Sequence, residues 1–192
     1  EMLRNARPMS GAGYKTGLIG TIANYIGDTE VKTMLTTPQS NEINSLLSQM
    51  INEGCTHCVM EVSSHALALH RVDYLNFETG IFTNITSDHM DYHKTFEHYL
   101  ASKKILFDMI PENGKIIYNA EDSNSSVLLK NSSAQKYSYG TDKNAECRVQ
   151  NVEFSLEGTN FDLSWKGIDY HLTTSLVGHF NAFNAASAFA AA

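Results

Sequence analysis

Two segments of this chain each begin as an apolar run and end in a dense set of oxygen and imidazole groups. The first is MEVSSHAL at residues 60–67, and the second is TNITSDHMDYH at residues 83–93. A buried parallel strand that delivers polar side chains at its carboxyl end has this pattern. Two such strand ends lying close together would form a site for metal and phosphate. The pair therefore predicts an enzyme.

Hydrophobic periodicity along the chain predicts a single α/β domain over residues 1–192, with a mostly parallel sheet flanked by helices. Residues 25–35 are expected to form a hairpin-like polar excursion, residues 1–6 the tail of a helix, and residues 7–13 the link after it. Between residues 145 and 175, alternation of polar and apolar residues predicts a small antiparallel subsheet. The other expected strands are 15–23, 58–62, 77–83, 115–119 and 136–139, and the other expected helices are 41–52, 95–109, 123–130 and 178–192.

Composition and charge exclude several classes of protein. The formal charge is −7 and the isoelectric point is about 5.5, so neither a nucleic acid nor an anionic membrane is expected as a partner. No stretch approaches the ~20 consecutive apolar residues that cross a bilayer. No signal peptide is visible, and three cysteines without framework spacing favour a reduced cytoplasm.

Two short patterns resemble known motifs without matching them. Cys55 and Cys58 have the spacing of a zinc or redox half-site, but no second ligand pair lies at zinc-ribbon distance, and Cys58 starts the apolar run CVM. We therefore expect Cys58 to pack in the sheet. The run GAGYKT at 11–16 is not a phosphate loop, because Tyr14 separates the glycine from the lysine and a helix precedes the run where a strand should.

Five motifs occur in an order that is typical of one enzyme family. They are MEVSSHAL at 60–67, HR at 70–71, TNITSDHMDYH at 83–93, YLASKKILF at 99–107 and GHFNAFN at 178–184. Together they resemble the central, ATP-binding domain of the Mur ligases, and most closely of those that extend UDP-N-acetylmuramoyl-L-alanyl-D-glutamate. Folylpolyglutamate and cyanophycin synthetases share this fold and some of the motifs, but are not expected to combine EVSSHAL with the downstream arginine.

The resemblance implies an ATP-dependent ligase of peptidoglycan precursor synthesis in the bacterial cytoplasm. Such an enzyme transfers the γ-phosphoryl group of ATP to a substrate carboxylate, and an amine then displaces phosphate from the acyl phosphate. The carboxylate would belong to UDP-MurNAc-L-Ala-D-Glu, and the amine to L-lysine or meso-diaminopimelate. The sequence leaves the choice of diamino acid open, and we expect a monomer.

Glu61, His89 and Lys103 are the catalytic and metal-binding residues that the resemblance implies. Glu61 and His89 would bind magnesium ions at the phosphates of ATP. Glu61 also lies in an apolar run, where a carboxylate would be buried without a partner unless a cation were supplied. Lys103 would be carbamylated by carbon dioxide to an anionic oxygen ligand, whereas Lys104 would face outward. Carbamylation requires a neutral amine, and burial lowers the pKa of a lysine.

Further residues are implied to bind the two larger substrates. Hydroxyl groups and an arginine fork suit the pyrophosphate and carboxylate oxygens of the UDP-muramoyl dipeptide. Asparagines at i and i+3 near a helix start would reach an adenine edge. The implied dipeptide-binding residues are Thr36, Thr37, Ser63, His65 and Arg71, and the implied ATP-binding residues are Asn84, Asn119, Asp122, Asn181 and Asn184.

The sequence departs from the family pattern in what it lacks. The family's phosphate loop and its N- and C-terminal domains have no counterpart in the 192 residues, and the link at 7–13 is longer than expected. We therefore expect these residues alone not to catalyse ligation. Two alternatives stay open: a non-catalytic module that binds UDP-muramoyl groups, and a related ligase that acts on another γ-glutamyl substrate. The presence of Glu61, His89 and Lys103 favours the working ligase.

Overall fold

The computed structural model describes residues 13–86 and 90–192. The chain divides into two compact units, called unit 1 (up to Leu75) and unit 2 (from Asn76), and each is described by itself. The helix expected at 1–6 lies outside the described residues, as does the link expected at 7–13 apart from Gly13. His89, one of the expected metal ligands, also lies outside them.

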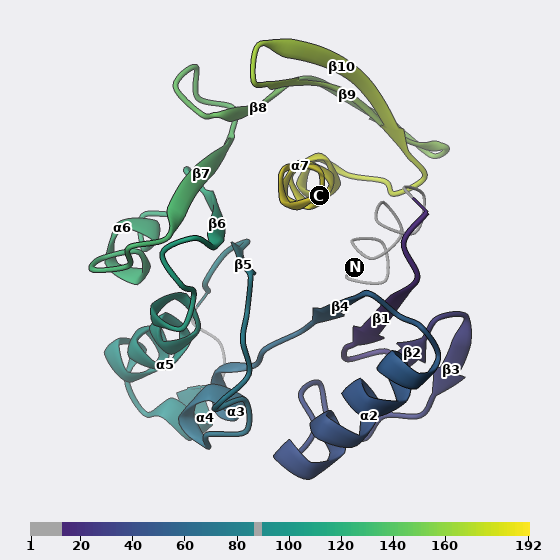
Figure 1. Ribbon diagram of the computed structural model, residues 1–192. Helices are drawn as coiled ribbons and strands as arrows, with labels where there is room; N and C mark the ends of the chain where they lie inside the picture. Colours follow the sequence, from purple (N-terminus) through teal and green to yellow (C-terminus); the bar gives the residue numbers. More distant parts are fainter. Residues whose placement is uncertain (1–12, 87–89) are drawn as a thin grey trace. The chain divides into compact units, whose positions relative to one another are not determined.

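Unit 1 contains a four-stranded sheet and two described helices. The strands are β1 (Thr16–Ile19), β2 (Asn24–Ile26), β3 (Thr29–Val31) and β4 (His57–Met60), and the helices are α2 (Ser40–Asn52) and α3 (Ser64–Ala68). The strand order is β3-β2-β1-β4 (Figure 1). β1 pairs in parallel with β4 and antiparallel with β2. The β2–β3 hairpin confirms the polar excursion expected at 25–35. Helix α2 buries Ile43, Leu46 and Met50, which recur at helical spacing, and packs over β1 and β2.

Unit 2 contains a six-stranded sheet (Figure 1). Its strands are β5 (Thr79–Phe82), β6 (Lys115–Asn119), β7 (Gln135–Gly140), β8 (Cys147–Ser155), β9 (Gly158–Trp165) and β10 (Ile168–Thr174), and its helices are α4 (Met90–His93), α5 (Phe96–Asp108), α6 (Ser125–Leu128) and α7 (His179–Ala191). β5 to β8 pair in parallel and β8 to β10 antiparallel, in the order β10-β9-β8-β7-β6-β5. The α/β class with a small antiparallel subsheet is thus confirmed. None of the described helices has the length and apolar character to span a bilayer.

Two apolar cores cover opposite faces of the unit 2 sheet. Ile116 and Ile117 are neighbours in β6, and both are buried because successive strand residues point to opposite faces. Ile116 joins Phe82 and Phe107 in one core, whereas Ile117 joins Phe161 and residues of α7 in the other. With both faces covered, the carboxyl ends of the parallel strands are where polar side chains can reach a ligand.

The expectation that Cys58 packs in the sheet is wrong. Cys58 lies in β4, but its side chain is exposed. The physical reason is that β4 is an edge strand of the four-stranded sheet and α2 packs over β1 and β2. Cys55 and Cys58 are both free thiols.

Gly158, at the start of β9, occupies a position with no room for a side chain. Its φ is +148°, and a Cβ there would lie 2.1 Å from the carbonyl oxygen of Thr174. Because that oxygen belongs to the backbone, Gly158→Ala has to displace the end of β10 and should destabilise the protein by about 2–4 kcal/mol. The matched control is Gly167→Ala, since Gly167 has φ +79° but open space around it. Urea unfolding that finds the two variants equally stable would contradict this steric explanation.

Candidate functional site

The first group of site residues lies at the carboxyl ends of β1 and β4 in unit 1. Glu61 directly follows β4, and its N–H donates to the Ile19 carbonyl oxygen at 2.8 Å, which extends the parallel pairing by one residue. The loop after β1 crosses this strand end. As a result, the Thr21 N–H donates to Glu61 Oε2 at 2.8 Å, and the Thr21 hydroxyl donates to the same oxygen.

The expectation that the Glu61 carboxylate has no partner within the protein is therefore wrong. Thr21 satisfies Oε2, whereas Oε1 makes no hydrogen bond within the part of the chain that the structure describes. A carboxylate held by one oxygen and open at the other suits a hard cation such as Mg²⁺. Thr21 was not among the expected site residues, because the strand expected at 15–23 includes it, whereas β1 ends at Ile19 and leaves Thr21 in the loop.

Thr37 connects Glu61 to the start of α3. The Thr37 side chain is 1% exposed, and its hydroxyl donates to the Glu61 carbonyl oxygen at 2.8 Å. The same hydroxyl accepts a hydrogen bond from the Ser63 N–H at 2.9 Å. Ser63 in turn caps α3, because its Oγ accepts a hydrogen bond from the Ala66 N–H at 3.2 Å. The end of β4 and the start of α3 are thus held by one buried hydroxyl.

Arg71 and Thr36 extend this group. Arg71 Nη1 donates to the Thr37 carbonyl oxygen at 3.0 Å, but the buried Arg71 Nε finds no acceptor among the described residues. A guanidinium with an unused buried donor suits an anionic oxygen. The Thr36 and Thr21 hydroxyl oxygens lie 3.0 Å apart, and because the Thr21 hydroxyl donates to Glu61, Thr36 is the donor of this pair. His65 lies in α3. Of the residues expected to bind the dipeptide, this hydrogen-bonded network contains Thr36, Thr37, Ser63 and Arg71.

Lys103, on α5 of unit 2, differs from its neighbour Lys104. Burial lowers the pKa of the Lys103 ammonium group, and its Nζ lies 5.4 Å from the centre of the Tyr99 ring. Lys104 instead forms an ion pair with Asp108, one turn further along the helix. Successive helix residues point about 100° apart, so the two half-buried lysines have different neighbours: Lys103 lies near the Tyr99 ring and Lys104 beside the Asp108 carboxylate. The lowered pKa favours the neutral amine that carbamylation needs.

Asn119 and Asp122, expected to contact ATP, have partners within unit 2. Asn119 Nδ2 donates to the Thr83 carbonyl oxygen at 2.9 Å, and Asp122 Oδ2 accepts a hydrogen bond from the Ile85 N–H at 2.9 Å. Asn84 lies between Thr83 and Ile85, whose backbone groups accept and donate these two hydrogen bonds, and Asn84 is exposed. The ends of β5 and β6 are therefore joined through side chains.

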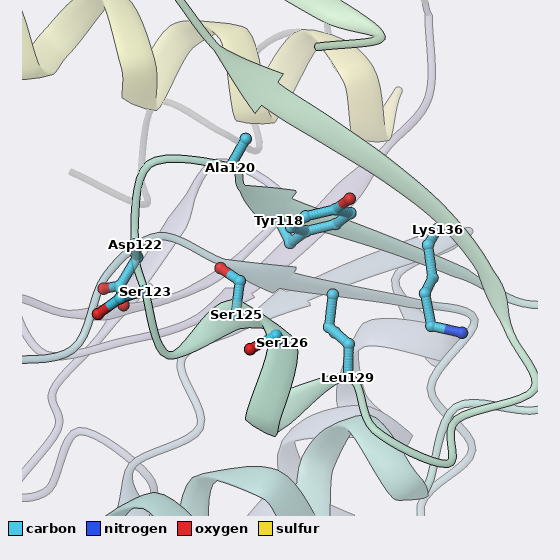
Figure 2. A pocket seen from close by; sticks show the side chains of 8 residues that line it. All are labelled: Tyr118, Ala120, Asp122, Ser123, Ser125, Ser126, Leu129 and Lys136. Carbon is cyan, nitrogen blue, oxygen red and sulfur yellow. The ribbon is translucent and has the colours of Figure 1, made fainter. Parts of the chain in front are cut away.

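A pocket of about 440 Å³ opens beside the turn between β6 and α6 (Figure 2). Its lining includes Asp122, serines of the turn and of α6, Tyr118 on β6 and Lys136 on β7. The Lys136 ammonium group donates a hydrogen bond to the Ser132 carbonyl oxygen at 2.6 Å, so it contacts the backbone. The pocket offers the hydroxyl groups of its serines, whereas both oxygens of its one carboxylate, Asp122, already accept hydrogen bonds from Ile85 and Asn124.

Asn181 and Asn184 share one face of α7. Asn181 is 3% exposed, and its amide donates to the Val177 carbonyl oxygen at 3.0 Å. Asn184 is half-buried, and its Nδ2 lies 3.5 Å from Asn181 Oδ1. Asn181 therefore ties the helix to the segment before it, and Asn184 keeps more of its side chain accessible.

The expected metal centre is described only in part. Glu61 belongs to unit 1, Lys103 belongs to unit 2, and His89 lies outside the described residues. Within residues 13–86 and 90–192, no group of three or more His, Cys, Asp and Glu side chains is arranged to hold a metal ion. The fit to Mg²⁺ therefore rests on the open Oε1 of Glu61.

The Mur ligase middle domain matches residues 1–192. A UDP-N-acetylmuramoyl-L-alanyl-D-glutamate--2,6-diaminopimelate ligase of Clostridium acetobutylicum is 43% identical over 183 residues, which cover 95% of this chain and 37% of that protein. A solved structure of a ligase with the same substrates in its name has a TM-score of 0.85 at 24% identity, over 97% of this chain and 39% of that chain. A MurF ligase of Thermotoga maritima, solved in complex with ADP, has a TM-score of 0.60 at 15% identity, over 80% of this chain and 37% of that chain. The chain thus spans little more than a third of the length of these relatives.

The two hydrogen bonds of the buried Thr37 hydroxyl predict that its removal lowers the free energy of unfolding. Thr37→Val leaves the Ser63 N–H and the Glu61 carbonyl oxygen without this partner at nearly constant side-chain volume. Unpaired buried groups cost about 1–3 kcal/mol each, so we expect the free energy of unfolding to fall by about 2–4 kcal/mol. Thr36→Val is the matched control and should cost less than about 1 kcal/mol, because it removes one contact between hydroxyls. Equal losses in urea unfolding would show that the Thr37 hydroxyl does not hold this strand end.

Proposed function

Because this chain belongs to the Mur ligase family, as a middle domain of that family, we propose that it is the ATP-handling part of a peptidoglycan-precursor ligase. The proposed reaction joins 2,6-diaminopimelate to UDP-MurNAc-L-Ala-D-Glu with hydrolysis of ATP to ADP and phosphate. Since the chain spans little more than a third of its relatives, the activity is proposed for the whole protein that contains it. The observation that carries the proposal is the network of Thr37, Glu61, Ser63 and Arg71.

The network presents groups that acyl-phosphate chemistry uses. A carboxylate oxygen of the substrate attacks the γ-phosphorus, and the bond from phosphorus to the ADP oxygen breaks. The amine nitrogen then attacks the acyl carbon and loses a proton to solvent, the bond from the acyl carbon to the phosphate oxygen breaks, and phosphate leaves with its electron pair. Arg71 would hold an anionic oxygen of the muramoyl substrate, with the hydroxyls of Thr36 and Ser63 and the imidazole of His65 as further polar contacts. Mg²⁺, when bound at Glu61, supplies charge neutralisation at the phosphates.

The nucleotide would meet groups on unit 2. We assign Asn84 and Asn184 as contacts of ATP, because both keep accessible side chains. The structure of a relative with bound ADP supports an adenine nucleotide as the ligand. Substrates such as ATP and a UDP-sugar favour the bacterial cytoplasm as the location. The monomeric state stays a prediction.

The names of the relatives favour 2,6-diaminopimelate over L-lysine as the amine. The full-length protein, given ATP and UDP-MurNAc-L-Ala-D-Glu, should release ADP and phosphate when a diamino acid is added. The rate with meso-diaminopimelate should exceed that with L-lysine about a hundredfold or more, because a site built for a second carboxylate is left unpaired by lysine. A preference for L-lysine would overturn the choice of amine. Tight binding of UDP-MurNAc-L-Ala-D-Glu in the absence of ATP, without turnover when ATP is added, would favour the non-catalytic module.

Lys103 provides a separate test of the carbamate. The neutral amine attacks carbon dioxide, an N–C bond forms and a proton is released, so the cation becomes an anion. Lys103→Arg keeps a positive charge but cannot form this group, and it should lower the ligation rate about 10²–10³-fold. Lys104→Arg is the matched control and should retain activity, because Lys104 is paired with Asp108.

A spectroscopic measurement identifies the modified residue directly. Protein equilibrated with carbon-13-labelled bicarbonate should show a carbamate signal in NMR spectra that Lys103→Arg removes and Lys104→Arg leaves. The signal requires the neutral amine, and the lowered pKa of Lys103 extends its pH range downward. A full signal in Lys103→Arg would assign the carbamate elsewhere.

A further inference from the structure

Two side chains hold the backbone just before Asn84. Asn119, at the end of β6, donates to the Thr83 carbonyl oxygen at 2.9 Å. The hydroxyl of Tyr139, on β7, lies 3.2 Å from the Phe82 carbonyl oxygen and 3.4 Å from that of Thr83. Tyr139 is 1% exposed, so this hydroxyl is an internal group whose acceptors lie at the end of β5. The end of β5 is thus fixed by β6, its neighbour in the sheet, and by β7, the strand beyond β6.

A carboxylate holds the backbone just after Asn84. The Ile85 N–H donates to Asp122 Oδ2 at 2.9 Å, and the Ile85 side chain is 8% exposed. The other oxygen, Asp122 Oδ1, accepts hydrogen bonds from the N–H and the amide of Asn124 at 2.8 and 2.9 Å. Both oxygens of Asp122 are thus engaged within the protein. The turn that bears Asp122 also borders the pocket in Figure 2.

These hydrogen bonds fix the backbone on both sides of Asn84, at Thr83 and at Ile85, but none of them involves the Asn84 side chain. The Asn84 side chain is exposed and makes no hydrogen bond within the described part of unit 2. We propose that Asn119, Asp122 and Tyr139, called the strand-end clamp, are positioning residues that orient Asn84 toward the phosphate or sugar oxygens of a nucleotide. The inference rests on the proposed function for the identity of that ligand. It gives Asn119 and Asp122 a role through Asn84 in place of direct contact.

Hydrogen exchange tests the clamp without reference to activity. In the full-length protein, Asp122→Ala should speed exchange of the Ile85 amide about tenfold or more, because the amide loses its acceptor. The Thr141 amide, which donates to Glu121 Oε1 at 2.7 Å in the same region, should be unchanged. The matched control is Asn124→Ala, which removes a neighbour of Asp122 and leaves the bond to Ile85.

A second variant keeps the test valid if Asp122→Ala does not fold. Asn119→Asp retains the side-chain oxygen that accepts from the Glu121 N–H. It replaces the donor to the Thr83 carbonyl oxygen with an acceptor, so it should also speed exchange at Ile85 and weaken ATP binding.

A double-mutant cycle separates positioning from contact. Asp122→Ala alone should weaken ATP binding about tenfold in calorimetry. In an Asn84→Ala background it should cause no further loss, although exchange at Ile85 still accelerates. Additive losses would show that Asp122 touches the nucleotide and would overturn the inference. Unchanged exchange at Ile85 would overturn the clamp itself. A wild-type protein that binds no ATP would overturn the proposed function, and the positioning role with it.

Discussion

The positions of the candidate site residues in each unit depend on the parallel pairing of strands, because this pairing brings the carboxyl ends of neighbouring strands together. In unit 1, Ile19 and Met60 are register partners at the ends of β1 and β4. In unit 2, β5, β6 and β7 pair in the same way. Backbone groups just beyond these ends have lost their partners in the sheet, so side chains must satisfy them. Thr37 at the Glu61 carbonyl oxygen and Asn119 at the Thr83 carbonyl oxygen are the clearest instances.

Much of the fold could be predicted because apolar runs and turn residues are local signals. The passage from apolar to polar residues marks the ends of β4 and β5, and strict alternation marks the antiparallel subsheet. The exposure of Cys58 could not be predicted in this way. It depends on which strand forms the edge of the sheet and on which strands α2 covers, and both follow from contacts between distant residues. Thr21 was missed for the same reason, because it lies 40 residues from the carboxylate that it holds.

The site was predictable in its residue types and less so in its bonds. The hydroxyls and the guanidinium of unit 1 were expected to act together, and the structure joins Thr37, Ser63 and Arg71 through hydrogen bonds. Which of two adjacent lysines is unusual follows from helix geometry and burial together. Lys103 and Lys104 have the same chemistry in water, yet burial lowers the pKa of Lys103, whereas Lys104 has a carboxylate partner.

Polar residues at a strand end serve two purposes, and their hydrogen bonds distinguish them. Thr37 and Asp122 use their side-chain oxygens to satisfy the protein's own backbone. Glu61 Oε1 and Arg71 Nε keep unused capacity within the described part of unit 1. Arg71 Nε is buried, and a buried donor without an acceptor costs free energy, so a ligand that supplies the missing acceptor stabilises the arrangement. A carboxylate oxygen attracts a cation and a guanidinium N–H attracts an anion. This pair of unused groups therefore has the charge pattern of a site for a metal ion and an oxyanion, which the backbone alone does not require.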